Sequence, residues 1–486
     1  TVVVVRSLNG DDILGPVEME SGSFGLRALK LQMRSLPFWS EGDLSLMNAE
    51  GEVLTADSRH LSGGSWTHPL VLTAIRTERS FYGVPWGAIC ERPESSSALQ
   101  QLTSGGLMSV VASEKAVAAV TKKGAVVFCP GELDGLYEES DGEDDVDDDL
   151  IQHTWEQQKA ELSEGVNAIY ANMAAFAAIK EGGKVVCWGR RHSGGWIPKE
   201  KAEKLCSGVK TIAHTSEAFA ALKETGEVVT WGKASFGGNC ESVADKLVDV
   251  VSITGTWGTS DSGAFAALTK SGACIVWGNH DSGGNSRDVA EDLQHGVLSI
   301  SSAGNAFAAL KDGGRVVTWG RADSGGEMIV TWGPDSEDDE EASDDGQEED
   351  ESEEKGETYS VQDQLSSGVI SVVGSDNVFV ALKDTGEVVA WGCAPDGAHL
   401  PDELRSRLNK GAPVRSIGTG SCTFAALKED GSVVLWGVLD DFGNGTMEKA
   451  NAEVELTSDV VSVSHLCKPN MWGMFAFKKD GAAIPI

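Results

Sequence analysis

The sequence predicts an all-β repeat propeller of about seven blades, each three- to four-stranded, preceded by an N-terminal α+β domain. The first observation is a recurring element, which reads AFAALKDGGRVVTWGRADSGG at 306–326, AFAALTKSGACIVWGNHDSGG at 264–284, AFAAIKEGGKVVCWGRRHSGG at 175–195 and AFAALKETGEVVTWGKASFGG at 218–238. The second is the period-two alternation of apolar residues inside that element. The third is that the first eighty residues do not contain it.

Each copy is anchored by a Gly and by a Trp five residues later. The six clear pairs are Gly183/Trp188, Gly226/Trp231, Gly272/Trp277, Gly314/Trp319, Gly386/Trp391 and Gly431/Trp436. Successive Trp residues lie 43, 46, 42, 72 and 45 positions apart. Two degenerate copies, at Gly124 with Cys129 and at Gly481 with Ile486, bring the number of repeat cores to eight. We interpret the six Trp as structural residues of the blades.

Within a unit, the alternation predicts a β-hairpin. Phe307 and Ala309 would face one way and residues 308 and 310 the other, as in a strand. Residues 312–314 form the turn and residues 315–319 the returning strand. An apolar run that precedes the hairpin, as in residues 297–300, supplies a third strand. Such small sheets must stack face to face, and the long period favours a propeller over a linear β-solenoid.

This repeat string resembles that of the regulator of chromosome condensation family, across about residues 80–486. The short connectors are similar to those of the bacterial β-lactamase-inhibitor propeller, which has three-stranded blades. The resemblance implies seven blades, give or take one. It does not select a function, because such propellers act as exchange factors, light sensors, inhibitors and accessory domains of ligases.

The Asp-Ser-Gly-Gly run in this repeat is also found around the nucleophile of serine proteases. However, the serine recurs as Ser193, Ser282 and Ser324, and Phe236 replaces it in a fourth copy, whereas a nucleophile would be unique. The histidines that follow the Trp, namely His192, His280 and His399, fall in different blades, which argues against a metal site. We therefore expect no catalytic residues, no cofactor and no metal, and a protein that is not an enzyme.

The net charge of −36 comes mostly from two segments. Residues 134–149 carry ten acidic groups and residues 335–354 carry fourteen, with no Lys or Arg in either. We predict disordered acidic inserts at 132–150 and 327–359, the second of which begins with an echo of the blade sequence, VTWG at 330–333. The acidity argues against nucleic acid or an anionic membrane as a direct partner.

The first 77 residues are predicted to form strands at 1–6, 13–19, 43–47, 51–54 and 70–75, with an amphipathic helix at 25–35. This order, with Leu8 and Gly10 in the first turn, resembles ubiquitin. The resemblance implies a weak recognition patch at Leu8, with Met47 and either Thr73 or Ala74 as less certain members. The absence of a terminal diglycine argues against conjugation. Residues 78–106 are a linker or a degenerate first blade segment, and residues 107–486 form the propeller.

The nine cysteines are scattered and never form a C-x-x-C pair, which indicates a reducing, cytoplasmic or nuclear location. There is no apolar run of 18 residues, so no transmembrane helix is expected.

The favoured function is a protein-interaction scaffold that acts as an adaptor in ubiquitin-linked processes, with ubiquitin-system receptors among its partners. One alternative is a guanine-nucleotide exchange factor for a small GTPase. Another is an accessory fragment of a HERC-type ligase, without the catalytic HECT domain. Light sensing is poorly supported, because the Trp-Arg-His-Thr motif of the plant photoreceptor is absent.

Overall fold

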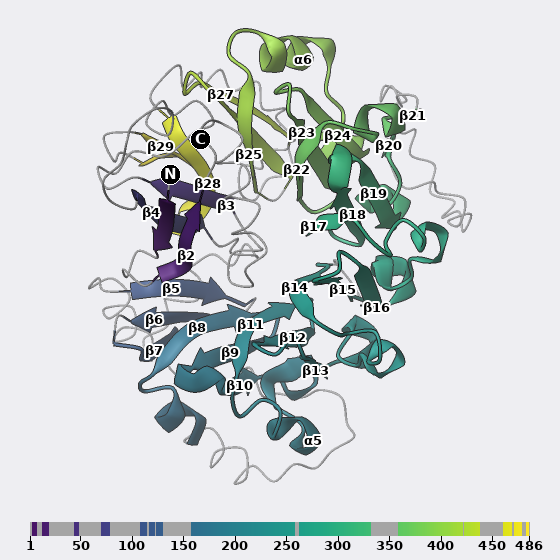
Figure 1. The fold of residues 1–486 in the computed structure, drawn as a ribbon. Helices are drawn as coiled ribbons and strands as arrows, with labels where there is room; N and C mark the ends of the chain where they lie inside the picture. Colours follow the sequence, from purple (N-terminus) through teal and green to yellow (C-terminus); the bar gives the residue numbers. More distant parts are fainter. Residues whose placement is uncertain are drawn as a thin grey trace, which may run out of the picture.

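The computed structural model describes residues 2–6, 12–18, 43–47, 70–77, 107–113, 116–121, 123–129, 157–257, 262–331, 358–420, 422–437, 460–468, 471–478 and 483–485. Within them, eight antiparallel three-stranded units follow one another in chain order around a ring, in the arrangement of a β-propeller (Figure 1). The prediction of seven blades, give or take one, therefore includes the observed number, because both degenerate copies form sheets of their own.

Every unit has the same strand order. The first strands are β5 (Leu107–Ala112), β8 (Val166–Ala171), β11 (Val209–His214), β14 (Val250–Gly255), β17 (Val297–Ser302), β22 (Val369–Gly374), β25 (Val414–Thr419) and β28 (Val460–Lys468). The middle strands are β6 (Val117–Thr121), β9 (Ala175–Lys180), β12 (Ala218–Lys223), β15 (Ala264–Thr269), β18 (Ala306–Lys311), β23 (Val378–Lys383), β26 (Thr423–Lys428) and β29 (Met471–Lys478). The third strands are β7 (Val126–Cys129), β10 (Val185–Gly189), β13 (Val228–Gly232), β16 (Cys274–Gly278), β19 (Val316–Gly320), β24 (Val388–Cys393), β27 (Val433–Gly437) and β30 (Ala483–Pro485).

Short helical turns join these strands. Turns after the third strand are η4 (Arg191–Gly195), η5 (Ala234–Phe236), η7 (His280–Gly284), η10 (Ala322–Ser324) and η12 (Ala394–Ala398). The connectors to the next unit are α5 (Lys199–Ala202), η6 (Glu241–Val243), η8 (Arg287–Val289), η11 (Gln362–Leu365) and α6 (Asp402–Asn409), and the hairpin turns include η3 (Glu181–Gly183) and η9 (Asp312–Gly314). No helix among the described residues is long and apolar enough to cross a membrane.

The alternation along each middle strand divides its side chains between two neighbouring blades. Phe307 and Ala309 pack in a cluster with Ala264 and Ala266 of the preceding unit. The intervening side chains, such as Leu310, pack with the following unit. The small Ala side chains leave room for one buried Phe per joint, as the sequence pattern indicates.

The ends of the second acidic insert require a correction. Ile329–Thr331 forms β20 and Tyr359–Ser360 forms β21; β20 pairs with the edge of β24 on one side and with β21 on the other. Val330 is fully buried in the core, so this part of the predicted insert belongs to the blade. Apolar side chains at 328–330 and at 359 allow both ends to pack, whereas the acidic residues 335–354 lie outside the described residues. The insert predicted at 132–150 also lies outside them.

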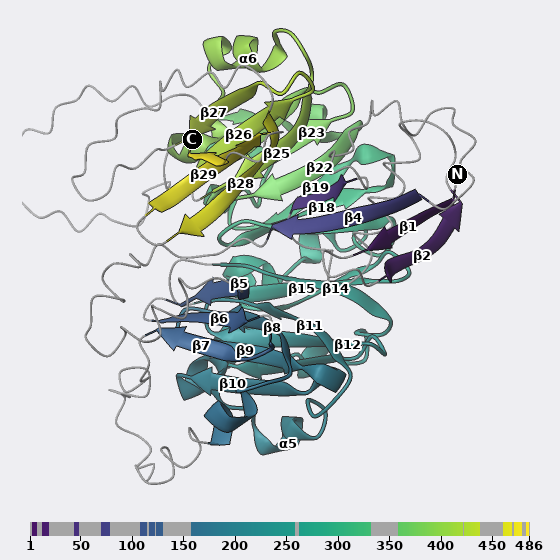
Figure 2. The same cartoon turned by 90° about the vertical axis from the view of Figure 1, so that its left-hand side faces the viewer.

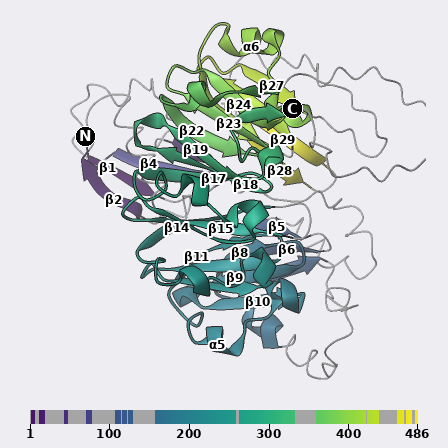
Figure 3. The same ribbon diagram turned by 90° about the vertical axis from the view of Figure 1, so that its right-hand side faces the viewer.

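The N-terminal strands form a separate four-stranded sheet in the order β2-β1-β4-β3. Its strands are β1 (Val2–Arg6), β2 (Asp12–Glu18), β3 (Asp43–Met47) and β4 (Leu70–Thr77). The central pair, β1 and β4, is parallel, and the two outer pairs are antiparallel. Figures 2 and 3 show β1, β2 and β4 side by side. The predicted helix at 25–35 and strand at 51–54 lie outside the described residues, so the ubiquitin-like assignment stays a prediction. The segment 78–106 also lies outside them.

Candidate functional site

The serines of the repeated Asp-Ser-Gly-Gly loop are buried structural residues. Ser282 is fully buried, and its Oγ donates a hydrogen bond to Oδ1 of Asn305 in the next unit at 3.0 Å. The Oγ of Ser324 lies 3.1 Å from Oδ1 of Asn377 in the next unit and 3.1 Å from Oδ1 of the neighbouring Asp323, and can donate to either. The Oγ of Ser193 is buried, with no partner among the described residues. Because these serines are buried, and Ser282 and Ser324 bond the Asn of the next unit, the loop connects blades.

The first glycine of each loop allows the next blade to approach closely. Gly283 has a φ of 91°, and a Cβ at this position would lie 2.7 Å from Cδ2 of Phe307. A Cβ on Gly194, Gly237 or Gly325 would lie 2.6–2.7 Å from the ring of the Phe in the next unit, in the pairs Gly194 with Phe219, Gly237 with Phe265 and Gly325 with Phe379. Glycine is therefore required by both the backbone conformation and the packing.

The repeat Trp completes the same joint. Its indole Nε1 donates to the carbonyl of this glycine, in the pairs Trp231 to Gly194, Trp277 to Gly237, Trp319 to Gly283, Trp391 to Gly325 and Trp436 to Gly397, at 3.0–3.2 Å. In all six clear repeats the Trp also stacks on the Phe of its own blade, with ring centroids 5.2–5.3 Å apart. The Nε1 of Trp188 is buried, with no partner among the described residues. All six Trp are buried, so none of them offers a binding surface.

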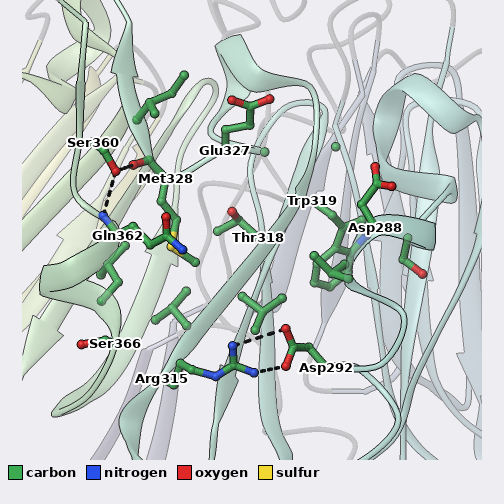
Figure 4. Close-up of a pocket in the computed structure, with 18 of the residues that line it drawn as sticks. Asp288, Asp292, Arg315, Thr318, Trp319, Glu327, Met328, Ser360, Gln362 and Ser366 are labelled. Atoms are coloured by element: carbon green, nitrogen blue, oxygen red, sulfur yellow. Dashed lines mark hydrogen bonds and ion pairs between the residues drawn. The ribbon is translucent and has the colours of Figure 1, made fainter.

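A groove of about 610 Å³ lies along the outer edge of β19 and is the candidate binding site (Figure 4). Its floor is β19 itself, from Val316 to Gly320. One wall is formed by η8 and the residues around it, and the other by residues 326–329 and by the start of η11. The volume lies within the range of small-molecule and peptide sites, roughly 300–1,000 Å³.

The backbone of β19 presents free hydrogen-bonding groups to this groove. Lys311 N–H donates to Arg315 O, and Arg321 N–H donates to Asn305 O, so the odd-numbered residues from 315 to 321 face β18. The N–H and C=O groups of Val316 and Thr318 consequently point away from β18, into the groove. Neither residue has an outward backbone partner among the described residues. Val316 is only 1% exposed and Thr318 only 8%, so this edge lies beneath the walls of the groove and is not open to another strand.

The charges at the groove are mainly negative. At one end, Asp292 forms an ion pair with Arg315, and the hydrogen bond from this guanidinium lowers the pKa of the Asp292 carboxyl. Near the other end lie the carboxylates of Asp288 and Glu327, which form no ion pair with any described residue (Figure 4). The groove therefore offers two carboxylates to a positively charged ligand.

The structure separates the other residues predicted from the sequence. His192 lies in η4, His280 in η7 and lining the groove, and His399 directly after η12. The described residues contain no group of three or more His, Cys, Asp or Glu that could hold a metal ion. In the N-terminal sheet, Met47 pairs with Thr73 across β3 and β4, whereas Leu8 lies outside the described residues.

One buried titratable group was not singled out from the sequence. His214, at the end of β11, packs edge-on against Trp257 with ring centroids 4.3 Å apart. Its Nδ1 is buried and has no hydrogen-bond partner among the described residues. This burial lowers the pKa of His214 to about 3, so the imidazole is neutral near pH 7 and contributes packing.

No family model matches the chain, and neither does any curated protein. Among solved structures, Prp20p from Saccharomyces cerevisiae is 18% identical, with 56% of this chain and 72% of that chain covered and a TM-score of 0.34. Yeast RCC1 (Prp20) bound to Kap60 is 18% identical, with 63% of this chain and 78% of that chain covered and a TM-score of 0.35. Human WBSCR16 is 14% identical, with 62% of this chain and 84% of that chain covered and a TM-score of 0.36. These TM-scores are too low to support an argument, so the propeller assignment depends on the sheets described above.

Proposed function

We propose that the chain is a non-enzymatic protein-interaction scaffold, with the groove at β19 as a docking site of the propeller. The observation that carries this proposal is a groove lined by the exposed carboxylates of Asp288 and Glu327, which form no ion pair with any described residue. The side chains that resemble catalytic groups, such as Ser282, are buried in joints between blades. A ring of blades that presents an acidic groove is suited to hold another protein with a complementary charge.

We also propose that residues 1–77 are a ubiquitin-like module that binds receptors of the ubiquitin system, which would make the chain an adaptor or an accessory part of a HERC-type ligase. The strand order β2-β1-β4-β3 supports this proposal, as does the pairing of Met47 with Thr73. The test is an NMR titration of residues 1–77 with proteasomal ubiquitin receptors. Leu8→Ala should weaken the shifts, and an absence of shifts with every receptor at millimolar concentration would overturn the module.

A second candidate is guanine-nucleotide exchange on a small GTPase. The repeat string resembles the regulator of chromosome condensation family, and the study of Prp20p describes binding of that protein to Gsp1p and histones. Release of a fluorescent GDP analogue from purified small GTPases, measured with and without the chain, tests this candidate. Accelerated release of the GDP analogue would show that the chain is an exchange factor rather than a scaffold without activity of its own.

The scaffold itself is tested by affinity capture from cell extract. The baits are the full chain, a chain without residues 1–77, and the full chain with Asp288→Asn and Glu327→Gln. We expect the groove variant to lose a set of proteins that the truncated chain retains. If all three baits capture the same proteins, the groove is not a docking site. We further propose a cytoplasmic or nuclear location, supported by the free thiols of Cys187 and Cys274.

A further inference from the structure

We propose that the rim of the ring next to β10 binds a short acidic segment of a partner protein. The site is separate from the groove at β19, which belongs to a unit three further along the chain. Five residues in or beside η4 and α5 form it, and we call them the basic patch: Arg190, Arg191, Trp196, Lys199 and Lys201. Figure 1 shows α5 at the outer rim of the ring.

Trp196 is an exposed aromatic residue that the repeat does not require. Its side chain is 44% exposed, whereas the six repeat Trp are buried. The corresponding residue in four other copies is polar, namely Asn239, Asn285, Glu327 and His399. The blades therefore join without an aromatic side chain at this position. An exposed Trp of this kind can provide the apolar contact of a protein interface.

Arg191 accompanies this Trp. Its Cζ lies over the Trp196 ring, 6.0 Å from the centroid, and this cation–π contact holds the two side chains together. Arg191 is exposed and forms no ion pair with any described residue. A guanidinium can bind a carboxylate through two N–H groups. The pair can therefore hold an acidic side chain and an apolar neighbour at the same time.

The other three cations lie close to Trp196. The N–H of Gly195 donates to the carbonyl of Arg190 at 2.9 Å, which brings Arg190 back beside the end of the loop. Lys199 follows Trp196 by three positions, so at most about 11 Å of chain separates them. Lys201 lies in the same short helix as Lys199. The local chain path thus gathers four cations around one aromatic side chain.

The positive charge of the basic patch is not balanced by the described residues. Nearby, Lys184 pairs with Glu161 and Lys204 with Glu227, each at 2.8 Å. No cation of the basic patch forms such a pair with a residue that the structure describes. These cations are consequently available to carboxylates of another chain.

The distribution of charge along the rim limits the size of the partner segment. Residues 190–204 contain five Lys or Arg and two Glu, the equivalent residues 233–247 contain two basic and two acidic residues, and residues 279–293 contain one and four. A nucleic acid carries a charge at every nucleotide and binds along an extended track of cations, which this rim does not supply. The basic patch therefore suits a short acidic peptide.

The test uses the full chain and a fluorescein-labelled peptide, Glu-Asp-Glu-Phe-Asp-Glu, with Gln-Asn-Gln-Phe-Asn-Gln as the uncharged control. Fluorescence anisotropy at low salt should show saturable binding of the acidic peptide, weaker binding as salt is raised, and no binding of the control. The same titration with residues 134–149 deleted shows whether the acidic segment of the chain itself occupies the basic patch.

Substitutions locate the binding site. Arg191→Gln with Lys199→Gln should weaken binding roughly five- to tenfold, and Trp196→Ala by a similar factor. Lys270→Gln removes an exposed cation of another unit, and Leu298→Ala removes an apolar side chain that is 45% exposed, so these matched controls should leave binding unchanged. Every substituted side chain is exposed, and circular dichroism checks that each variant is folded.

Three results would overturn the proposal. The first is no binding of the acidic peptide, or equal binding by the Arg191→Gln, Lys199→Gln variant. The second is binding that appears only after deletion of 134–149, which would assign the basic patch to the chain itself. The third is a labelled oligo(dT) that binds more tightly than the peptide and loses affinity in the same variants. None of these variants changes Asp288 or Glu327, so the groove at β19 is tested separately.

Discussion

Replacement of Gly283 by Ala tests whether the Asp-Ser-Gly-Gly loop is a joint between blades. Gly283 has a φ of 91°, and its missing Cβ would lie 2.7 Å from Cδ2 and 3.0 Å from Cε2 of Phe307. Gly313 offers a matched control, because its φ of 76° is also left-handed but nothing lies within 4 Å of its Cβ position. Ala at the control position therefore tests backbone strain alone.

The expected free energies follow from these two environments. The left-handed conformation should cost an Ala residue about 1–2 kcal/mol at either position. At Gly283 the new methyl group also collides with a fully buried Phe, and overpacking of this kind costs roughly 1–3 kcal/mol more. We expect Gly283→Ala to lose about 2–5 kcal/mol of unfolding free energy, against about 1–2 kcal/mol for Gly313→Ala.

Urea unfolding followed by Trp fluorescence measures both variants against the native chain. The prediction is a lower midpoint for Gly283→Ala than for Gly313→Ala, with similar slopes. Equal losses at the two positions would show that close approach to Phe307 contributes nothing. The joint would then have to be explained by the backbone conformation of the loop alone.

Three further predictions concern the core, a buried histidine and the ends of the second insert. Trp277→Ala should cost about 3–5 kcal/mol, because the indole is 2% exposed and donates to Gly237, and an unchanged melting temperature would contradict this role. Burial lowers the pKa of His214 from its ordinary 6.5 to about 3 in the folded protein. Between pH 6.5 and pH 3 the unfolded chain therefore binds a proton at this residue and the folded protein does not, so the free energy of unfolding should fall as the pH drops through this range. His214→Phe should therefore lose less stability than the native chain between about pH 7 and pH 4, and equal thermal shifts would refute the assignment. Deletion of 334–356 should leave unfolding cooperative, as followed by circular dichroism. Deletion of 327–360 also removes β20, β21 and the buried Val330, so it should lower the free energy of unfolding by at least about 1.5–3 kcal/mol. Equal stability of the two deletion variants would show that the two strands contribute nothing.

Much of the blade geometry can be predicted from the repeat sequence. The alternation around Phe307 predicts which side chains face each neighbouring blade, and the turn at 312–314 fixes the hairpin register. The two residue types that form each joint also recur at a fixed distance in the repeat: Trp319 and Gly325, the first glycine of the loop, are six positions apart in the chain. What the spacing does not reveal is that each Trp bonds the glycine of the preceding copy, because that contact depends on stacking of the blades.

The groove could not be predicted from the repeat. It forms where β20 and β21 extend one blade, whereas the sequence predicts an acidic insert there because acidic residues dominate that part of the chain. The apolar residues Ile329 and Val330, beside the repeated Val-Thr-Trp-Gly string, were the available signal. The burial of His214 was equally hidden, because it depends on Trp257, 43 positions later in the chain.

Site-specific photocrosslinking in cells tests the central claim, that the propeller acts by holding another protein at the groove beside β19. A benzophenone amino acid replaces Glu327 at the groove in one full-length variant and exposed Asp245 in the other. We expect illumination to yield a discrete crosslinked protein from position 327 and not from position 245. Identical products from both positions, or none from position 327, would contradict it.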